Sequence, residues 1–548
     1  MNDLLLEIKD LGIHAGKNRI TEHVSLELKR STITGLVGES GSGKTITALS
    51  VLGLLPPGVN ATSGTIMFHD HDGSHDLLTA STKTLNNIRG NRISMIFQEP
   101  MTSLNPSMRC GKQAMEPLLK LKKYNRAETR EKILDLFREV KLPDVEKIFN
   151  AWPHELSGGQ RQRVMIAMAL ATSPGLLIAD EPTTALDVTV QKNLLKLLLE
   201  LRDKFDLSIL FITHDLLVLK QIADEVSVMY GGRIVESGTM DQVLENPETP
   251  YAKGLLACRP GLDNQPIRLL TIEDFMENSA KLSKTEPLPS RPPSGEVLLT
   301  VKDLNVRFKS KGRPVNAVRD VSFDLFRGET LGLVGESGCG KTTLGRSILQ
   351  LINIDNGSVI YRGRPLNQMN NRELRQVRRK IQIVFQDPYS SLNPGMTIGN
   401  TLMEPMMIHG LAKGKRQAAA QVIHLLERVE MPADILNLYP HQFSGGQRQR
   451  IGIARALACQ PEFIVLDESV SALDVSVQAR ILNLLNDLKQ EFQLTYIFIS
   501  HDLTVVKYMS DRVMVMSEGE IIETGTSEQI YLHPSNPYTR QLIESIPV

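Results

Sequence analysis

The sequence predicts an α/β fold that is repeated twice along the chain. Three observations lead to this prediction. The same landmarks recur in the same order in both halves, each half has a GxxxxGKT loop between an apolar run and a helical pattern, and each half has a later apolar run that ends in two acids. Apolar runs that alternate with helical periodicity are typical of a parallel sheet covered by helices.

Bulk composition restricts the class of protein. At 548 residues the chain exceeds the ~250 to 300 residues at which one hydrophobic core stops growing, so two or more domains are expected. No run approaches the ~18 apolar residues that a membrane helix needs, and MNDLLLEIKD lacks the features of a signal peptide. These features predict a cytosolic protein. Basic and acidic residues balance at 62 each, which disfavours nucleic acid as a partner.

The duplication sets the expected domain boundaries. LVGESGSGKT at 36–45 recurs as LVGESGCGKT at 333–342, and LSGGQRQR at 156–163 recurs as FSGGQRQR at 443–450. A repeat of ~290 residues is too long for a solenoid and predicts autonomous domains. We place them at 1–261 and 297–548. The stretch between them, 262–296, includes KTEPLPSRPPSGE and predicts an exposed tether, with a reach of roughly 30 Å if it is a flexible coil.

The glycine-rich loops are candidate phosphate sites. Apolar runs at 33–37 and 331–334 precede them, and helical patterns follow, which is the context that this motif requires. One such loop alone could be an ordinary turn, but two in the correct context argue against that alternative. Glycines let backbone N–H groups point at phosphate oxygens, the lysine adds positive charge, and the threonine hydroxyl can bind Mg²⁺. The candidate residues are Gly38, Ser40, Gly41, Gly43, Lys44 and Thr45, and Gly335, Ser337, Gly338, Gly340, Lys341 and Thr342.

Paired acids at strand ends are the candidate hydrolytic groups. LLIADEP at 176–182 and FIVLDES at 463–469 end in Asp-Glu, at the edge of a parallel sheet where ligands bind. Asp180 and Asp467 are expected to hold Mg²⁺, while Glu181 and Glu468 are expected to orient and deprotonate the attacking water. The next apolar runs end in His214 and His501, which could bond the γ-phosphate. The alternative is a pair of solvated acids at each strand end.

The remaining repeated motif carries a family resemblance. LSGGQ and FSGGQ resemble the signature sequence of the ATP-binding cassette (ABC) family, and ALD at 185–187 and 472–474 also matches. The resemblance covers nearly the whole chain. It implies two tandem ABC-type P-loop NTPase domains, each with a RecA-like core, an antiparallel β subdomain and a helical subdomain. It also identifies Gln98 and Gln386 as Q-loop residues that contact the metal, with ATP and Mg²⁺ as cofactors.

The resemblance further implies that the two domains pack head to tail as an intramolecular pseudo-dimer. Each ATP would then lie between the phosphate loop of one half and the signature of the other. A glycine pair at a helix start offers N–H donors and a positive dipole end, which suits an incoming phosphate. The expected signature contacts are Ser157, Gly158, Gly159 and Gln160, and Ser444, Gly445, Gly446 and Gln447.

Two positions depart from the family pattern. Ala15 aligns with Phe308, where family members usually stack an aromatic ring on adenine, so the first half lacks that platform unless His14 replaces it. Loss of such stacking costs about 0.5 to 1.5 kcal/mol. Ser469 stands where the family usually has proline after the catalytic acid. Because Glu181 and Glu468 are both present, both sites are expected to hydrolyse ATP.

Short tail motifs favour one branch of the family. NPETPYAKGLL at 246–256 and HPSNPYTRQLI at 533–543 are similar to the closing segment of oligopeptide and dipeptide importer ATPases. This resemblance implies two integral membrane permease subunits, an extracytoplasmic solute-binding protein, and a peripheral position on the cytoplasmic face of a bacterial inner membrane. The alternative is a soluble tandem ABC ATPase that acts on ribosomes or nucleic acid. Such proteins are expected to have a long charged helical linker or zinc motifs.

Overall fold

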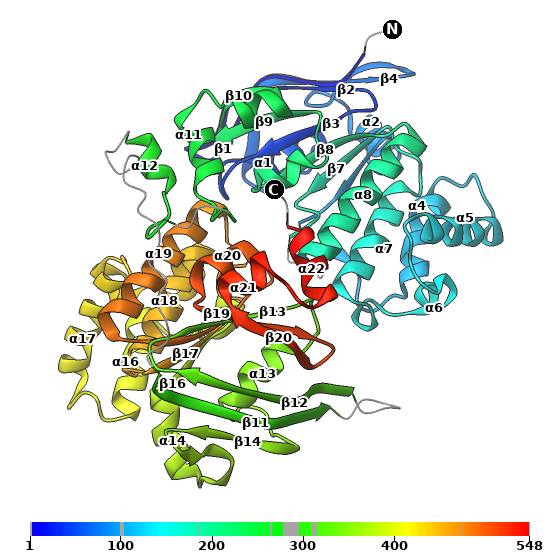
Figure 1. The fold of residues 1–548 in the computed structure, drawn as a ribbon. Helices are drawn as coiled ribbons and strands as arrows, with labels where there is room; N and C mark the ends of the chain where they lie inside the picture. The colour runs from blue at the N-terminus through cyan, green and yellow to red at the C-terminus, as the bar shows by residue number, and fades with distance from the viewer. Residues whose placement is uncertain are drawn as a thin grey trace.

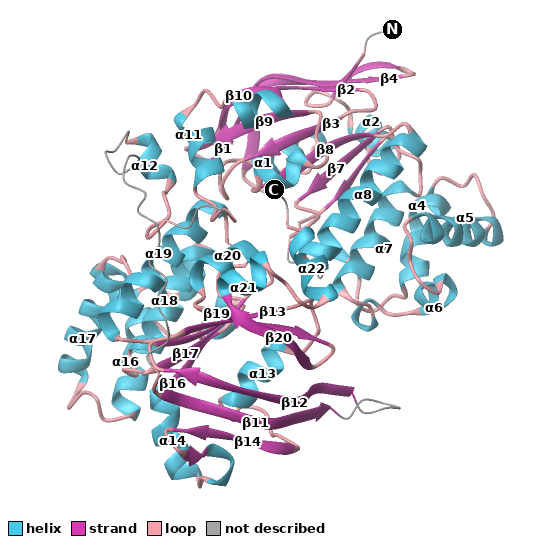
Figure 2. Cartoon of the chain, in the orientation of Figure 1, coloured by secondary structure: helices cyan, strands magenta, loops and turns pink. Residues whose placement is uncertain are grey.

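The computed structural model describes residues 3–98, 103–184, 186–262, 266–277, 295–308, 315–471 and 473–546. The two halves of the chain form two similar lobes, coloured blue to green and green to red in Figure 1. Each lobe contains a six-stranded sheet, a four-stranded antiparallel sheet and a group of helices (Figure 2). The prediction of an α/β fold in two tandem copies is therefore confirmed.

The six-stranded sheet forms the centre of the first half. Its strands, from edge to edge, are β10 (Arg233–Thr239), β9 (Glu225–Tyr230), β3 (Ile33–Val37), β8 (Ser208–Thr213), β7 (Leu176–Asp180) and β6 (Ile93–Ile96). β10 is antiparallel to β9, and the other pairings are parallel. Every residue of β3, β7 and β8 is buried, as expected for a parallel sheet with both faces covered. The carboxyl ends of these three strands therefore lie together.

An antiparallel sheet and a set of helices complete the first half. The sheet has the order β2 (Asn18–Lys29), β1 (Leu4–Ala15), β4 (Val59–Asp70) and β5 (Gly73–Asp76). The helices are α1 (Lys44–Val51), α2 (Thr82–Ile88), α4 (Cys110–Lys120), α5 (Arg126–Glu139), α6 (Val145–Asn150), α7 (Gly158–Leu170), α8 (Val188–Phe205), α9 (Leu216–Lys220), α10 (Met240–Glu245) and α11 (Pro250–Ala257). Helices α4 to α7 form a separate group beside the sheet (Figure 1).

The second half repeats this plan. Its central sheet has the order β16 (Ile381–Val384), β17 (Phe463–Asp467), β18 (Thr495–Ile499), β13 (Thr330–Val334), β19 (Arg512–Ser517) and β20 (Glu520–Thr526). Its antiparallel sheet has the order β12 (Val315–Phe326), β11 (Val297–Phe308), β14 (Asn356–Tyr361) and β15 (Arg364–Pro365). Its helices are α13 (Lys341–Ile348), α14 (Asn371–Lys380), α15 (Pro388–Ser391), α16 (Ile398–Ile408), α17 (Lys415–Arg428), α18 (Gly445–Leu457), α19 (Val475–Phe492), α20 (Leu503–Met509), α21 (Ser527–Leu532) and α22 (Pro537–Glu544).

The two halves share a hydrophobic core. One cluster of buried apolar side chains includes residues of β3 and α8 together with residues of β18 and α19. The two antiparallel sheets, in contrast, pack over separate clusters. The C-terminal helix α22 crosses to the first half, where the Glu544 carbonyl accepts a hydrogen bond from Lys192 of α8 at 3.3 Å. Apolar burial therefore holds the halves together in addition to their covalent connection.

Part of the predicted tether is folded. Helix α12 (Ile272–Met276) packs on α11, and Leu269 and Ile272 are buried. The Leu269 backbone exchanges two hydrogen bonds, each 2.9 Å long, with the Asn483 side chain of α19. Residues 266–277 are therefore not an exposed tether, because they pack between the two halves. The predicted boundaries at 261 and 297 stay a prediction, and most of the proline-rich stretch lies outside the described residues.

The described helices differ from a membrane span in length or in hydropathy. None of them is both long enough and apolar enough to cross a bilayer.

Candidate nucleotide-binding sites

Close backbone contacts explain the glycines of the phosphate loops. Gly43 begins α1 with a φ of 105°, and Gly340 begins α13 with a φ of 111°. A Cβ atom on Gly38 would lie 2.1 Å from the Met229 carbonyl oxygen, and one on Gly335 would lie 2.1 Å from that of Met516. Residues with a side chain therefore do not fit at these turns. The loops have the same conformation in both halves, as their sequences predict.

The loop lysines are buried and point into their own loops. Lys44 Nζ donates to the carbonyls of Gly38 and Glu39, both at 2.8 Å. Lys341 Nζ makes the equivalent bonds to Gly335 and Glu336 at 2.7 and 2.8 Å. Burial lowers the pKa of Lys44, although neighbouring carboxylates, first of all Glu181, act in the opposite direction. An ammonium held only by carbonyls can turn to an anion that enters the loop.

Tyrosines from the tail motifs support both loops. The Tyr251 hydroxyl accepts a hydrogen bond from the Glu39 N–H at 2.9 Å, and the Tyr538 hydroxyl accepts one from Glu336 at 3.1 Å. Burial raises the pKa of Tyr538 to about 12, so the hydroxyl keeps its proton. The Pro-Tyr motifs carry a family resemblance, but this contact with the phosphate loops was not predicted from the sequence. The Pro-Tyr pair that recurs in both halves was the sequence signal that could have indicated this contact.

The aspartates after β7 and β17 lie beside the loop threonines. Thr45 Oγ1 donates to Asp180 Oδ1 at 3.2 Å, and Thr342 Oγ1 donates to Asp467 Oδ1 at 3.0 Å. Burial raises the pKa of Asp180 to about 6 and also raises that of Asp467. The buried Asp467 Oδ2 has no hydrogen-bond partner among the described residues. A hard cation would satisfy that oxygen, so this threonine and aspartate pair fits Mg²⁺.

The described residues also contain no cluster of three or more His, Cys, Asp or Glu side chains that could hold a metal alone.

Each candidate catalytic glutamate has a strained backbone and a histidine partner. Glu181 and Glu468 have φ values of 48° and 46°, a region that side chains disfavour and that concentrates at functional sites. His214 Nδ1 lies 3.4 Å from Glu181 Oε2, and His501 Nδ1 lies 3.5 Å from Glu468 Oε2. The structure therefore brings together the acid and the histidine that the sequence predicted at successive strand ends.

The pKa values of these pairs follow from the contacts. Burial alone would raise the pKa of Glu181, but His214, the Thr184 hydroxyl and Lys44 lower it to about 2. Burial would likewise raise the pKa of Glu468, but His501 and Lys341 lower it. For His214, burial lowers the pKa, while the bond and charge of Glu181 outweigh that effect and raise it. Both glutamates are therefore ionised at neutral pH.

The Q-loop glutamines differ between the halves. Gln386 Nε2 donates to Glu468 Oε2 at 2.7 Å. Gln98 is exposed, and in the described part of the chain it makes no matching bond to Glu181. Instead, Glu181 Oε2 accepts from the Thr184 hydroxyl at 2.8 Å. The predicted contact of both glutamines with a metal stays a prediction.

The signature motifs begin helices, as the sequence predicts. Ser157 and Gln160 form a reciprocal capping box at the start of α7, and Ser444 and Gln447 form the same box at α18. A Cβ atom on Gly159 would lie 2.9 Å from Val190 of α8, and one on Gly446 would lie 2.4 Å from Val477 of α19. The second glycine is thus required by helix packing.

The first glycine of each signature has more room. A Cβ atom on Gly158 would have no neighbour within 4 Å, and one on Gly445 would meet only Leu473, at 3.9 Å. The open face of each signature is therefore available to a ligand from outside its own half.

Contacts across the seam join each phosphate loop to the opposite half. The Ser40 N–H donates to Asp474 Oδ2 at 2.9 Å, and the Ser476 hydroxyl bonds the Glu39 carboxylate. Asp187 of the first half is part of the wall of a pocket formed mainly by the second loop. The other residues of that pocket include Ser337, Gly338, Gly340, Lys341, Thr342, Gln386, Glu468 and His501. Residues of each half thus lie beside the phosphate loop of the other half.

The structure does not bring every predicted residue to these loops. No signature residue is among the described residues that line the second pocket, so Asp187 and not Ser157 reaches it from the first half. Phe308 is exposed at the end of β11 and does not line the pocket either. His14 Nδ1 is bonded to Thr62 Oγ1 at 2.8 Å, so this ring is already engaged with β4. Nucleotide contacts by the signatures and Phe308 stay predictions.

Comparison with known families agrees with this geometry. The family described as "ABC transporter" matches residues 21–184 and 318–471. The chain therefore belongs to the ABC transporter family. The description "Oligopeptide/dipeptide transporter, C-terminal region" matches residues 235–285 and 522–548, after each cassette. Within the family, the chain is accordingly a tandem ATP-binding protein of the oligopeptide branch.

Several curated proteins are similar along nearly their whole length. The Glutathione import ATP-binding protein GsiA of Pectobacterium atrosepticum is 41% identical over 562 residues, covering 99% of this chain and 90% of that protein. The protein of the same name from Shigella boydii is 44% identical, and that from Escherichia coli K12 is 43% identical. Both alignments cover 96% of this chain and 86% of the relative.

Proposed function

We propose that this chain is the ATP-hydrolysing subunit that powers import of peptides or related small solutes, glutathione among them. The observation that carries the proposal is the pair of oligopeptide-transporter regions, one after each cassette. Their tyrosines contact the phosphate loops, so the regions that define the branch are physically joined to the ATP sites. The curated relatives, all named as glutathione import ATP-binding proteins, support the same function.

The partners follow from the same family. The oligopeptide-transporter regions and the import function in the names of the curated relatives support membrane permeases as partners. We infer two integral membrane permease subunits and an extracytoplasmic solute-binding protein, with this chain peripheral on the cytoplasmic face of a bacterial inner membrane. The apolar groove of the first half, which includes Phe97, Leu104 and Met168, lies next to the Q-loop and suits a docked permease helix.

The division of labour among the residues is also inferred. ATP would bind with its phosphates on the N–H groups of a phosphate loop, and the loop lysine would turn from its carbonyl partners to the phosphates. Glu181 and Glu468 would orient and accept a proton from the attacking water. In the present geometry His214 holds the Glu181 carboxylate at a pKa of about 2, which makes it a weak base. A γ-phosphate that takes over the histidine would release the carboxylate for this work.

Mg²⁺ fits beside each loop. Thr45 and Asp180 would hold it in the first half, and Thr342 and Asp467 in the second, with Gln98 and Gln386 nearby. When bound, the ion would neutralise charge on the phosphates. The buried Asp467 Oδ2, which has no hydrogen-bond partner in the described part of the chain, supports this placement.

The test is removal of both glutamate carboxylates. Changing Glu181→Gln and Glu468→Gln together should leave ATP binding intact and lower turnover by at least ~100-fold, the lower range for loss of a general base. ATP binding by equilibrium dialysis and phosphate release measured on the same preparation separate the two effects. Near-normal phosphate release would contradict the assignment. Import of labelled glutathione or a dipeptide by vesicles with the cognate permeases then tests the transported class.

A further inference from the structure

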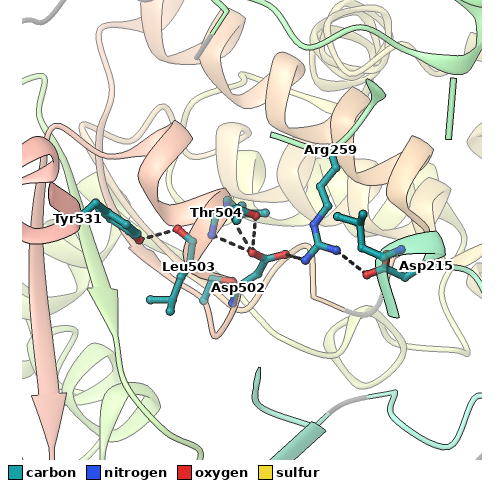
Figure 3. Close-up of polar contacts among 9 residues, drawn as sticks. Asp215, Arg259, Asp502, Leu503, Thr504 and Tyr531 are labelled. Carbon is teal, nitrogen blue, oxygen red and sulfur yellow. Dashed lines mark hydrogen bonds and ion pairs between the residues drawn. The ribbon is translucent and has the colours of Figure 1, made fainter. Parts of the chain in front are cut away.

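A single arginine bridges the two halves at the seam. Arg259 follows α11, and its Nη1 lies 2.6 Å from Asp215 Oδ2 of the first half. Its Nη2 lies 3.5 Å from Asp502 Oδ2 of the second half (Figure 3). All three side chains are largely buried, with exposed fractions of 14%, 17% and 18%. Matching PYAKGLLACR to PYTRQLIESI sets Ile546 opposite Arg259, so the duplication does not supply a second arginine here.

Each aspartate uses its two oxygens for different purposes. Asp215 Oδ1 accepts from the Leu217 N–H at 2.9 Å and caps α9. Asp502 Oδ1 accepts from the Thr504 N–H at 2.9 Å and from its hydroxyl at 2.7 Å, and caps α20. The Oδ2 atoms remain for Arg259. The guanidinium is therefore attached to the first turn of one helix in each half, and its planar fork sets the separation of the two caps.

These caps lie next to the hydrolytic histidines. Asp215 and Asp502 directly follow His214 and His501, whose rings face the candidate catalytic glutamates. Both histidines also line one cavity of about 90 Å³ on the seam, and Arg259 is part of its wall. A displacement of either helix cap would thus be transmitted to the other cap through the Arg259 side chain. The unequal distances to the two aspartates place the guanidinium nearer the first half.

Electrostatics keep this bridge closed. Burial alone would raise the pKa of Asp502, but the Arg259 charge and the Thr504 bond lower it below its usual value. For Arg259, burial acts to lower the pKa, but the charges of Asp215 and Asp502 outweigh burial and raise it. Without the arginine, two buried carboxylates would face each other across the seam, which is strongly unfavourable. The charges of the three groups therefore favour the bridged arrangement.

We propose that Arg259 is a positioning residue that couples the two ATP sites by fixing the histidine segment of one half to that of the other. This coupling role rests on the proposed ATPase function, and it adds a link between the sites that the duplicated motifs do not contain. Hydrolysis or release at one site would shift its histidine segment, and the guanidinium would transmit this shift to the other. Coupling of this kind is measurable as cooperativity in ATP and as dependence of each site on the other.

The central experiment compares Arg259→Met, Arg259→Lys and the wild type. We expect the wild-type ATPase to have a Hill coefficient between one and about two, the ceiling for two sites. In R259M it should fall to about one, and in R259K it should lie between, because lysine keeps the charge and loses the fork. Arg268→Met is the matched control, since Arg268 forms an exposed ion pair across the same seam with Asp487 at 2.9 Å. It should change nothing.

A second readout uses one inactivated site. In the wild type, Glu468→Gln should lower turnover by more than about fivefold, the lower end of typical site coupling. In the R259M background, Glu468→Gln should remove only about half of the turnover, as expected for two independent sites. If R259M folds poorly, a variant that also carries Asp215→Asn and Asp502→Asn neutralises the facing carboxylates and keeps both caps, because asparagine is also a good N-cap. This variant should fold and still be uncoupled.

Three outcomes would overturn the proposal. They are a wild-type Hill coefficient of one, an unchanged Hill coefficient in R259M, and an equal effect of E468Q in both backgrounds. Failure of the proposed function is distinguishable, because it requires turnover by the variant that lacks both Glu181 and Glu468 carboxylates. Loss of that turnover together with unchanged coupling in R259M would contradict only the role of Arg259.

Discussion

The two phosphate loops have nearly the same sequence and conformation, yet their surroundings differ. In the first, the Ser40 N–H already holds the Asp474 carboxylate at 2.9 Å. In the second, the corresponding aspartate of the other half, Asp187, lines the pocket of the loop, but its carboxylate caps α8 by accepting from the Val190 N–H at 2.9 Å. Asp474 forms no such cap on α19. One duplicated residue thus serves the opposite loop in one half and its own helix in the other.

This difference extends to the candidate catalytic glutamates. Glu181 is held by Thr184, whereas Glu468 is held by Gln386. The Ser471 hydroxyl, at the position that matches Thr184, bonds the Glu468 carbonyl instead of its carboxylate. Shared motifs therefore predict shared chemistry, but the neighbours of each motif decide how tightly each site binds and how its groups ionise.

Burial of Asp180 and Asp467, the aspartates beside the loop threonines, provides the strongest test of this comparison. Burial raises the pKa of Asp180 to about 6, from an unfolded value near 3.8. The folded state therefore binds the proton more tightly, and stability falls as pH rises from about 4 to 6. Replacing Asp180 with Asn should stabilise the nucleotide-free protein at pH 7.5 by at most about 3 kcal/mol, because one pKa unit equals about 1.4 kcal/mol.

Thermal unfolding at two pH values checks this prediction. The gain from Asp180→Asn should be several degrees at pH 7.5 and only about a third as large at pH 4.5, where the wild-type group is protonated in the folded state but mostly ionised in the unfolded chain. Asp467→Asn is the matched change in the second half and should also stabilise at pH 7.5, since burial raises that pKa as well. Equal gains at both pH values would show that ionisation is not the cause.

The carboxylate on the first loop provides a second test. Asp474→Asn removes a negative charge from the Ser40 N–H, a donor that phosphate would otherwise use. Hydrogen bonds to charged groups contribute about 1.5 to 3 kcal/mol, so ATP should bind the first loop at least about tenfold more tightly. A fluorescent ATP analogue, titrated in a Lys341→Ala background, isolates that loop.

The control is the same substitution at the equivalent position. Asp187→Asn, studied with Lys44→Ala, keeps the α8 cap because asparagine also caps helices. It should change affinity at the second loop much less than Asp474→Asn changes the first. Equal effects would mean that the asymmetric contact at Ser40 has no energetic consequence.

Much of this architecture could be predicted because it is local in sequence. The loop glycines, the Asp-Glu pairs and the helix starts at the signature glycines depend on neighbours within a few residues, and the structure places all of them as expected along the strands and helices. The strand before the second loop begins at Thr330, one residue earlier than predicted. Parallel strands also bring their carboxyl ends together, which explains why the histidines reach the glutamates.

Contacts across the seam could not be predicted in the same way. Ser40 and Asp474, or Arg259 and Asp502, are separated by hundreds of residues and join only when the two halves pack. The packing of residues 266–277 was missed for the same reason, because Leu269 and Ile272 are too few to give a periodic signal in a polar stretch. A short apolar segment becomes recognisable only when the surface that covers it is known.

Substitutions at the predicted adenine-stacking position, Ala15 and Phe308, are expected to have the smallest effect on ATP binding. Ala15 ends β1 where Phe308 ends β11, and the Phe308 ring is 43% exposed, so it is free to stack on a base. Phe308→Ala should weaken ATP binding at the second loop by about 0.5 to 1.5 kcal/mol, roughly two- to tenfold, while Ala15→Phe should strengthen binding at the first by a similar factor. Titrations with GTP and with ATP should both show the loss of affinity in Phe308→Ala, because stacking uses the face of the base and not its polar edge. An effect of Phe308→Ala on turnover without any change in affinity would place the ring outside the nucleotide site.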